Sequence, residues 1–204
     1  RLFDIQKISN GAYAIKTRVT SSASCLDVYN WSTAAGGNIA QYSYWGGACQ
    51  LWILEKASDT KGTDISLSAN DLTYGNYTNA ITSGSFTIGA SSGKNVAVLN
   101  RNATVNGTSY SKVLQMNGGG NSTGRYIKFT ATGACTVKVT AASTSTSASR
   151  TLRLASGSVG GSTVGNATIT GTPSTVTYKI PSAGTYYLYS TRSGIYVYQV
   201  NVAY

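Results

Sequence analysis

The sequence contains no histidine, only two prolines and only six acidic residues, and the last of these acids is Asp71. Charged residues make up 11% of its 204 positions, well below the roughly 25% of an average soluble domain. No apolar run approaches the roughly 20 residues that could cross a bilayer, and the start does not read as an export signal. We therefore expect no membrane partner, and we expect any export signal to have been removed already.

The part of the chain after Asp71 has ten basic residues and no carboxylate side chain. It cannot supply a carboxylate pair, a histidine-based triad or an acidic cage for a hard cation. A single cysteine, Cys135, and no histidine leave zinc without ligands. Glycines 118–120 are not followed by the Lys-Ser/Thr of a P-loop. These absences predict a binding protein rather than an enzyme, with no metal and no cofactor.

The net charge of +10 falls entirely on residues 72–204, because residues 1–71 balance six acids with six bases. Unpaired like charges repel one another, whereas a positive surface attracts a polyanion. Lys and Arg donate charge-assisted hydrogen bonds to carboxylates, and Arg can do so in a bidentate manner. Nucleic acid would also suit this charge, but no recognition helix or RNA-binding signature is present. The composition therefore indicates an acidic ligand other than nucleic acid.

Short apolar segments alternate with Gly, Ser and Asn clusters, and no helix-period stretch exceeds a turn or two. Lys138, Arg153 and Lys179 each stand between two apolar residues, which is the period of a strand with one solvent face. The spacing of the segments predicts an all-β protein with an antiparallel, jelly-roll-like β-sandwich. The expected strands are 12–15, 26–29, 39–44, 51–54, 85–88, 96–99, 112–116, 126–130, 136–140, 151–154, 175–180, 186–190 and 195–202.

Composition divides the chain into an aromatic-rich part at 1–57, a polar linker at 58–71 and the sandwich at 72–204. The three cysteines leave at least one thiol unpaired. Cys25 and Cys49 could form a disulfide, or all three could be small buried residues; spacing does not decide between these alternatives.

The first part contains Cys25-Leu26-Asp27-Val28, then residues 36–42, then Gln50-Leu51-Trp52. This pattern resembles one repeat of a ricin B-type β-trefoil lectin, a family 13 carbohydrate-binding module, with residues 1–5 as the tail of a preceding repeat. The resemblance implies a trefoil of three repeats, of which this chain holds one. A single repeat cannot bury its apolar faces alone, so we expect a fragment of a longer multimodular protein.

The same resemblance implies a sugar site at Asp27, Tyr42 and Gln50. A carboxylate would accept sugar hydroxyls while the apolar sugar face stacks on a ring. Cys49 stands where the family usually has Asn, and Tyr44 stands where the usual disulfide partner of Cys25 would be. The alternative is that Asp27 caps a turn and residues 50–52 are core. A lectin for neutral sugars of galactose or xylan type is thus the second function considered.

From about residue 72 the chain resembles the family 77 carbohydrate-binding module of pectate lyases. The motifs that carry this resemblance are 86–88, the hairpin 105–110 leading into 112–116, 126–129, 149–152 and 183–190. The family is a β-sandwich that binds sparsely esterified homogalacturonan (pectin) without calcium, through a few basic side chains. The resemblance implies a secreted, non-catalytic module that acts in plant cell-wall degradation and is tethered to a catalytic domain outside this chain.

Carried over residue by residue, the family's basic contacts fall on Lys94, Lys112 and Arg192, the last an Arg where the family has Lys. Arg150, Lys128 and Tyr189 are secondary candidates. Other basic residues and tyrosines of the expected strands, such as Arg153, Lys138 and Lys179, could also contribute. Each residue is also consistent with a solvated surface charge or with cross-strand packing. A polysaccharide lyase with Lys, Arg or Tyr as base is the enzymatic alternative, which its ultraviolet-absorbing unsaturated product would reveal.

Overall fold

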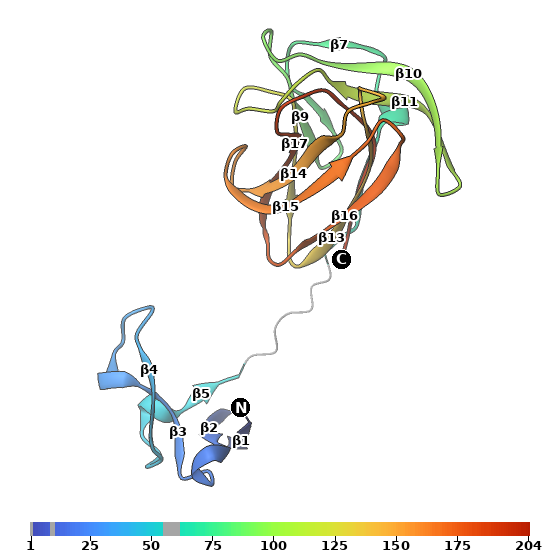
Figure 1. Ribbon diagram of the computed structural model, residues 1–204. Coiled ribbons are helices and arrows are strands. Elements are labelled where there is room, and N and C mark those ends of the chain that lie inside the picture. Colours follow the sequence, from blue (N-terminus) through green and yellow to red (C-terminus); the bar gives the residue numbers. More distant parts are fainter. Residues whose placement is uncertain (1, 9–10, 55–61) are drawn as a thin grey trace. The chain divides into compact units, whose positions relative to one another are not determined.

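The structure is a computed structural model that describes residues 2–8, 11–54 and 62–204 (Figure 1). The chain divides into two compact units, Arg1–Asp59 and Thr60–Tyr204. Every regular element among the described residues is a β-strand or a three-residue 3-10 helix, and none of them is a helix long and apolar enough to cross a membrane. The expected all-β class is confirmed.

The first unit is one antiparallel sheet in the order β1-β2-β3-β4, with β5 paired to β2. Its elements are β1 (Phe3–Lys7), β2 (Ala12–Thr17), η1 (Arg18–Thr20), β3 (Ser24–Val28), η2 (Tyr29–Trp31), β4 (Ile39–Ser43), η3 (Ala48–Gln50) and β5 (Trp52–Ile53). The four strands expected in this part are present. Whether the unit is a ricin-type repeat stays a prediction.

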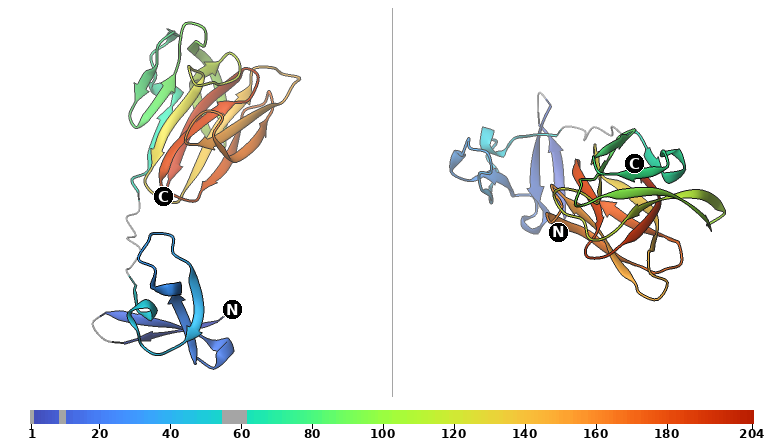
Figure 2. Two further views of the ribbon diagram at one scale, coloured as in Figure 1. Left: turned by 90° about the vertical axis from the view of Figure 1, so that its left-hand side faces the viewer. Right: turned by 90° about the horizontal axis from the view of Figure 1, so that it is seen from above.

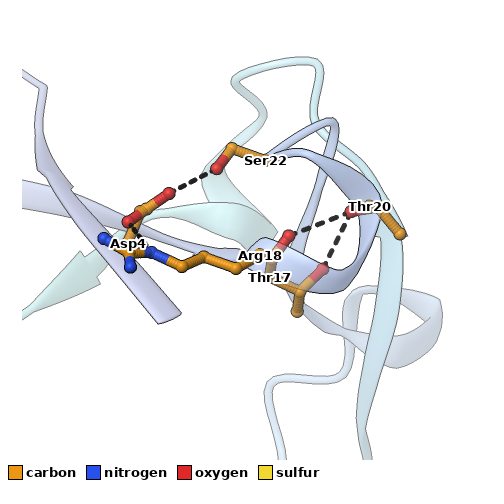
Figure 3. A network of polar contacts seen from close by, with 5 residues as sticks. All are labelled: Asp4, Thr17, Arg18, Thr20 and Ser22. Carbon is orange, nitrogen blue, oxygen red and sulfur yellow. Dashed lines mark hydrogen bonds and ion pairs between the residues drawn. The ribbon is translucent and has the colours of Figure 1, made fainter. Parts of the chain in front are cut away.

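The turn after β2 is tied to β1 by a small polar network (Figure 3). The Asp4 carboxylate accepts hydrogen bonds from Arg18 Nε at 2.6 Å and from the Ser22 hydroxyl, and the hydroxyl oxygens of Thr17 and Thr20 lie 3.0 Å apart. The bonds from Ser22 and Arg18 lower the pKa of Asp4 below its usual value. Apolar side chains of the same unit, among them Leu2, Phe3, Ile5, Val19 and Ile39, remain exposed.

The second unit is an antiparallel sandwich of two sheets (Figures 1 and 2). The seven-stranded sheet has the order β16-β13-β18-β11-β10-β7, with β6 paired to β18, and the six-stranded sheet has the order β15-β14-β17-β12-β9-β8. The elements are β6 (Ile65–Ser68), η4 (Ala69–Asp71), β7 (Gly75–Tyr77), β8 (Ile81–Ser83), β9 (Phe86–Gly89), β10 (Val96–Val105), β11 (Thr108–Met116), β12 (Tyr126–Ala131), β13 (Cys135–Ser143), β14 (Arg150–Ser156), β15 (Ser162–Ile169), β16 (Ser174–Ile180), β17 (Gly184–Ser190) and β18 (Ile195–Ala203). The expected sandwich is confirmed, and β6, β7, β8 and β15 are additional strands.

Period-two patterning places the core between the two sheets. Val137 and Val139 are fully buried while Lys138 between them is exposed, and Lys179 is exposed between two buried residues. Phe129 packs inside against Phe86, with ring centroids 5.7 Å apart. At the β10–β11 hairpin, Asn106 (φ 51°) and Gly107 (φ 79°) both have the left-handed backbone that the expected two-residue turn requires.

The linker expected at 58–71 is too long. Residues 58–61 lie outside the described part, but Leu67 on β6 is buried and pairs with Val200, and Ala69 and Leu72 are buried in the same core. Two leucines within a polar stretch supply enough apolar surface to add an edge segment to the sheet. The sandwich therefore includes residues 65–71.

All three cysteines, Cys25, Cys49 and Cys135, are free and buried. Burial raises the pKa of each thiol. Of the two alternatives left open, the structure has the small buried residues rather than the Cys25–Cys49 bridge.

Candidate functional site

A row of cations lies across the strand ends on one side of the six-stranded sheet. We call it the cationic rim, and it consists of Arg150, Arg192, Arg125 and Lys94. Arg150 begins β14, Arg192 follows β17, Arg125 precedes β12, and Lys94 lies in the turn after β9. These four strands are consecutive neighbours in the sheet. With strands about 4.8 Å apart, the row extends over about 14 Å.

Arg150 and Arg192 lie at the same end of adjacent strands and line one hollow. β14 and β17 pair Leu152 with Ser190, and the Thr191 amide extends this ladder by donating to the Thr151 carbonyl at 3.2 Å. The same register, continued by one more step, places Arg150 opposite Arg192. Like charges directly opposite in a sheet are destabilising, so folding alone does not favour this pair.

The two arginines line a hollow of about 150 Å³ whose other five lining residues are all serine or threonine. Arg192 is exposed, while Arg150 is half-buried and donates from Nη1 to its neighbouring Ser149 carbonyl at 3.0 Å. The Nε of Arg150 is the one buried side-chain nitrogen or oxygen of the described residues that has no hydrogen-bond partner. Such an unsatisfied donor calls for an explanation, and an acceptor on a ligand would supply one.

The loop 117–125 connects the arginine pair to Lys94. Gly119 and Gly120 donate from their amides to the Arg192 and Ser190 carbonyls, at 3.0 and 2.9 Å. At the other end of the loop, a Cβ on Gly124 would lie only 2.9 Å from the Lys94 Cβ, so a glycine is needed there. Arg125 donates from Nε to the Asn95 carbonyl at 3.2 Å, which holds this end of the loop in place.

Among the residues that the structure describes, no carboxylate forms an ion pair with these cations. Among the described residues the one ion pair within 4 Å is Arg18 with Asp4, in the first unit. The rim can therefore offer guanidinium, ammonium and hydroxyl donors to an anion.

The candidates Lys94, Lys112 and Arg192 do not all share one surface. Lys94 and Arg192 lie on the rim, but the Lys112 ammonium donates to the Asn70 and Leu72 carbonyls at 3.1 and 2.8 Å. Lys112 lies on β11 in the other sheet and holds η4 against that strand.

The secondary candidates also separate. Arg150 belongs to the rim, and Lys128 lies on β12 three residues beyond Arg125, opposite Tyr187. Tyr189 is only 4% exposed, and its hydroxyl accepts from the Gly160 amide at 3.1 Å. Its ring is covered and has no free face for a sugar, contrary to our expectation.

Lys138 and Lys179 are on the other sheet, so the ten cations do not form one positive face.

A second candidate site, the aromatic pocket, lies within the first unit and has a volume of about 360 Å³. Asp27 and Cys49 line it together with four aromatic residues, which are Tyr29, Trp31, Tyr42 and Trp45. All four aromatic side chains are more than half exposed, whereas Asp27 is 9% exposed. A buried acceptor surrounded by exposed rings is the arrangement that binds the hydroxyls and the apolar face of a sugar.

Gln50 is fully buried and orients this pocket. Its Nε2 donates to Asp27 Oδ2 and to the Ser43 carbonyl, both at 2.9 Å, and its Oε1 accepts from the Trp45 amide at 2.9 Å. Cys49 Sγ lies 3.5 Å from the same Asp27 oxygen, and burial followed by this contact raises the pKa of the thiol. The structure thus brings Asp27 and Tyr42 together, with Gln50 behind them rather than in the lining.

The sequence interpretation missed Arg125, Trp31 and Trp45. Arg125 reaches the rim through the pairing of β12 with β17, and this pairing has no local sequence signal. Trp31, the last residue of η2, and Trp45, between β4 and η3, fall between the segments of the lectin-like pattern. The sequence alone did not show that their rings would be exposed.

No family model and no curated protein matches the chain. Among solved structures, the CBM22-1 xylan-binding domain of Xyn10C from Paenibacillus barcinonensis has a TM-score of 0.46 and 14% identity, covering 72% of this chain and 97% of that domain. A structure described under glycan recognition by the Ruminococcus flavefaciens cellulosome has a TM-score of 0.45 and 15% identity, covering 70% and 95%.

The C-terminal CBM6 of LamC, a laminarinase from Zobellia galactanivorans, has a TM-score of 0.35 and 10% identity, covering 70% of this chain and all of the module. At these scores the likeness assigns no family, and we argue function from this chain's own residues.

Proposed function

We propose that the sandwich is a non-catalytic carbohydrate-binding module for acidic plant cell-wall polysaccharide, namely low-esterified homogalacturonan. The observation that carries this proposal is the pair Arg150 and Arg192 in a hydroxyl-lined hollow, with no carboxylate paired to either arginine among the described residues. In this proposal the protein is secreted and the module is tethered to a pectate lyase.

The chemistry of the rim suits this ligand. De-esterified pectin carries one carboxylate on each sugar ring, so a strand of it presents a regular line of negative charge. Arg192 and Arg150 would donate charge-assisted hydrogen bonds to successive carboxylates, and Lys94 would extend the contact along the rim. The buried Nε of Arg150 would gain the acceptor that it lacks within the described protein.

Affinity electrophoresis of the full chain tests the ligand. We expect polygalacturonate to retard the protein, and highly esterified pectin and xylan to leave it unretarded. The retardation should weaken at the higher of two ionic strengths and should survive a chelator, because no cluster of acidic ligands for calcium exists among the described residues. Equal retardation by esterified pectin, or release of an unsaturated product, contradicts the proposal.

Single substitutions test the residues. Arg192→Ala should weaken polygalacturonate binding about tenfold, the loss expected for a charge-assisted hydrogen bond of about 1.5 kcal/mol. Lys179→Ala is the matched control, because it removes the same charge from an exposed residue of the other sheet. If the two variants lose affinity equally, binding follows net charge and the rim is not the site.

The aromatic pocket supports a second function, the binding of a neutral sugar, which rests on the position of the buried Asp27 beside the exposed Tyr42. Asp27→Asn keeps the side-chain volume and removes the negative charge of the carboxylate that would accept hydrogen bonds from the sugar. We expect it to abolish the binding of neutral sugars and to leave polygalacturonate retardation unchanged. The opposite pattern would exclude the pocket as a sugar site.

A further inference from the structure

The aromatic pocket extends beyond the residues needed to hold one sugar ring. Trp31 and Trp45 lie side by side at its margin, with ring centroids 5.5 Å apart and planes tilted by 45°. They are 60% and 54% exposed. Exposed indoles bury little area on folding, so their apolar surface is available to a ligand.

The backbone holds both indoles in place by specific means. The Trp45 ring lies across Gly47, where a Cβ would fall 2.0 Å from the ring carbon Cη2. Asn30 and Trp31 both adopt left-handed backbone, with φ of 54° and 56°. Such a conformation is unfavourable for a bulky residue such as Trp31, and residues held in this way cluster at active sites and ligand-binding sites.

The charge of the pocket limits its ligand. Asp27 is the one charged residue among those that line the pocket, and no Lys or Arg lines it. Burial strengthens the field of this carboxylate, so it repels the carboxylate of a uronic acid. Its oxygen Oδ2 is already engaged by Gln50, which leaves Oδ1 as the acceptor for a ligand hydroxyl.

We infer that the aromatic pocket binds a neutral glycan of at least two rings. One ring lies on Tyr42 with its hydroxyls on Asp27, and the adjacent ring stacks on the Trp31–Trp45 pair. This inference rests on the proposed neutral-sugar function and adds the length and the charge of the ligand. The volume of about 360 Å³ lies within the range of about 300–1,000 Å³ for small-molecule pockets.

Intrinsic tryptophan fluorescence of the full chain tests the inference, since two of its three tryptophans line the pocket. The probes are two pairs, methyl β-galactoside with lactose and methyl β-xyloside with xylobiose. For at least one pair we expect the two-ring sugar to bind about two- to tenfold more tightly, the gain from one aromatic contact.

The variants Trp31→Ala and Gly47→Ala should remove this preference, so that the two-ring sugar binds no more tightly than the one-ring sugar. Gly47 has a φ of −70°, which alanine adopts freely, so the second variant displaces the Trp45 ring without straining the backbone. Tyr74→Ala, which removes an exposed aromatic residue of the other unit, is the control and should change neither affinity.

The outcomes separate the inference from the function on which it rests. A two-ring preference that survives both variants, or no preference in the unaltered protein, overturns the inference and leaves sugar binding intact. No response to any of the four probes, or an unchanged affinity in Asp27→Asn, contradicts the neutral-sugar function and the inference together.

Discussion

The two units differ in the share of polar residues that they bury and of large apolar residues that they expose. In the sandwich, Phe129 and Leu154 are buried, and no charged residue is among the buried residues described there. In the first unit, the fully buried Gln50 sits at the centre while Phe3 and Ile5 face solvent. The sandwich is thus held mainly by apolar burial, whereas the first unit depends on a polar centre.

Their candidate sites differ in the same way. The cationic rim brings together hydroxyl groups and cations that have no ion-pair partner among the described residues, at one end of a sheet, and the aromatic pocket surrounds one buried carboxylate with exposed rings. In our proposals the rim takes an acidic polymer and the pocket takes a neutral glycan. One chain would then bind two chemically distinct polysaccharides.

The largest expected effect contrasts two phenylalanines. Phe129→Ala should lower the free energy of unfolding of the sandwich by about 3–5 kcal/mol, because it opens a cavity beside Phe86 and Tyr186. Phe3→Ala, at a residue that is nearly half exposed, should cost the first unit less than about 0.5 kcal/mol. Urea unfolding measures both. Equal losses would mean that Phe3 is buried in solution and that the contrast between the units is wrong.

Gln50→Ala tests the polar centre of the first unit. It removes the partners of Asp27, the Ser43 carbonyl and the Trp45 amide, and we expect a loss of about 2–4 kcal/mol in that unit alone. The control is Gln41→Ala, at an exposed residue of β4. Calorimetry should show the transition of the first unit move while that of the sandwich stays. If Gln50→Ala leaves the unfolding transition of the first unit unchanged, that unit does not depend on a polar centre.

Lys112→Met separates structural from ligand-binding cations. Losing two hydrogen bonds from the ammonium to the Asn70 and Leu72 carbonyls should destabilise the sandwich by about 1–2 kcal/mol. Polygalacturonate affinity should remain within twofold of the unaltered protein. If affinity falls as far as in Arg192→Ala, Lys112 belongs to the binding surface after all.

The smallest expected effect is on the stability of the first unit at low pH. Because folding lowers the pKa of Asp4, its contribution to stability is present above the unfolded value of about 3.9 and is lost as pH falls through the lower folded value. The melting temperature of the first unit should therefore drop on acidification below about pH 4. Asp4→Asn should remove this part of the drop. An identical acid response in the variant would show that Asp4 does not contribute.

The sequence predicted the sandwich through residues whose signal is local. Alternation around Lys138 gives the two faces of β13, and Asn106-Gly107 gives the hairpin turn. The prediction of the linker was wrong because this segment has no such local signal. Leu67 and Leu72 are isolated apolar residues in polar surroundings. Only the pairing of Leu67 with Val200 of β18 and the position of both leucines in the core reveal that they belong to the sandwich.

The candidate sites were predicted in part. Asp27, Tyr42 and Gln50 follow a spaced pattern, and they are neighbours in the structure. Arg150 and Arg192 are 42 positions apart, and only the register of β14 with β17 sets them opposite each other. In the sequence, Lys112 is a lysine at a position that matches a binding cation. Its structural role depends on two carbonyl groups that the sequence does not locate.

The most direct measurement of the central claim compares two double variants of equal charge by calorimetric titration with polygalacturonate. Arg150→Gln/Arg192→Gln removes two charges from the rim, and Lys138→Gln/Lys179→Gln removes two from exposed residues of the other sheet. We expect the first variant to lose at least about tenfold in affinity and the second to lose no more than about twofold. Equal losses in both would contradict the claim that the position of the rim arginines, rather than total charge, binds the acidic polymer.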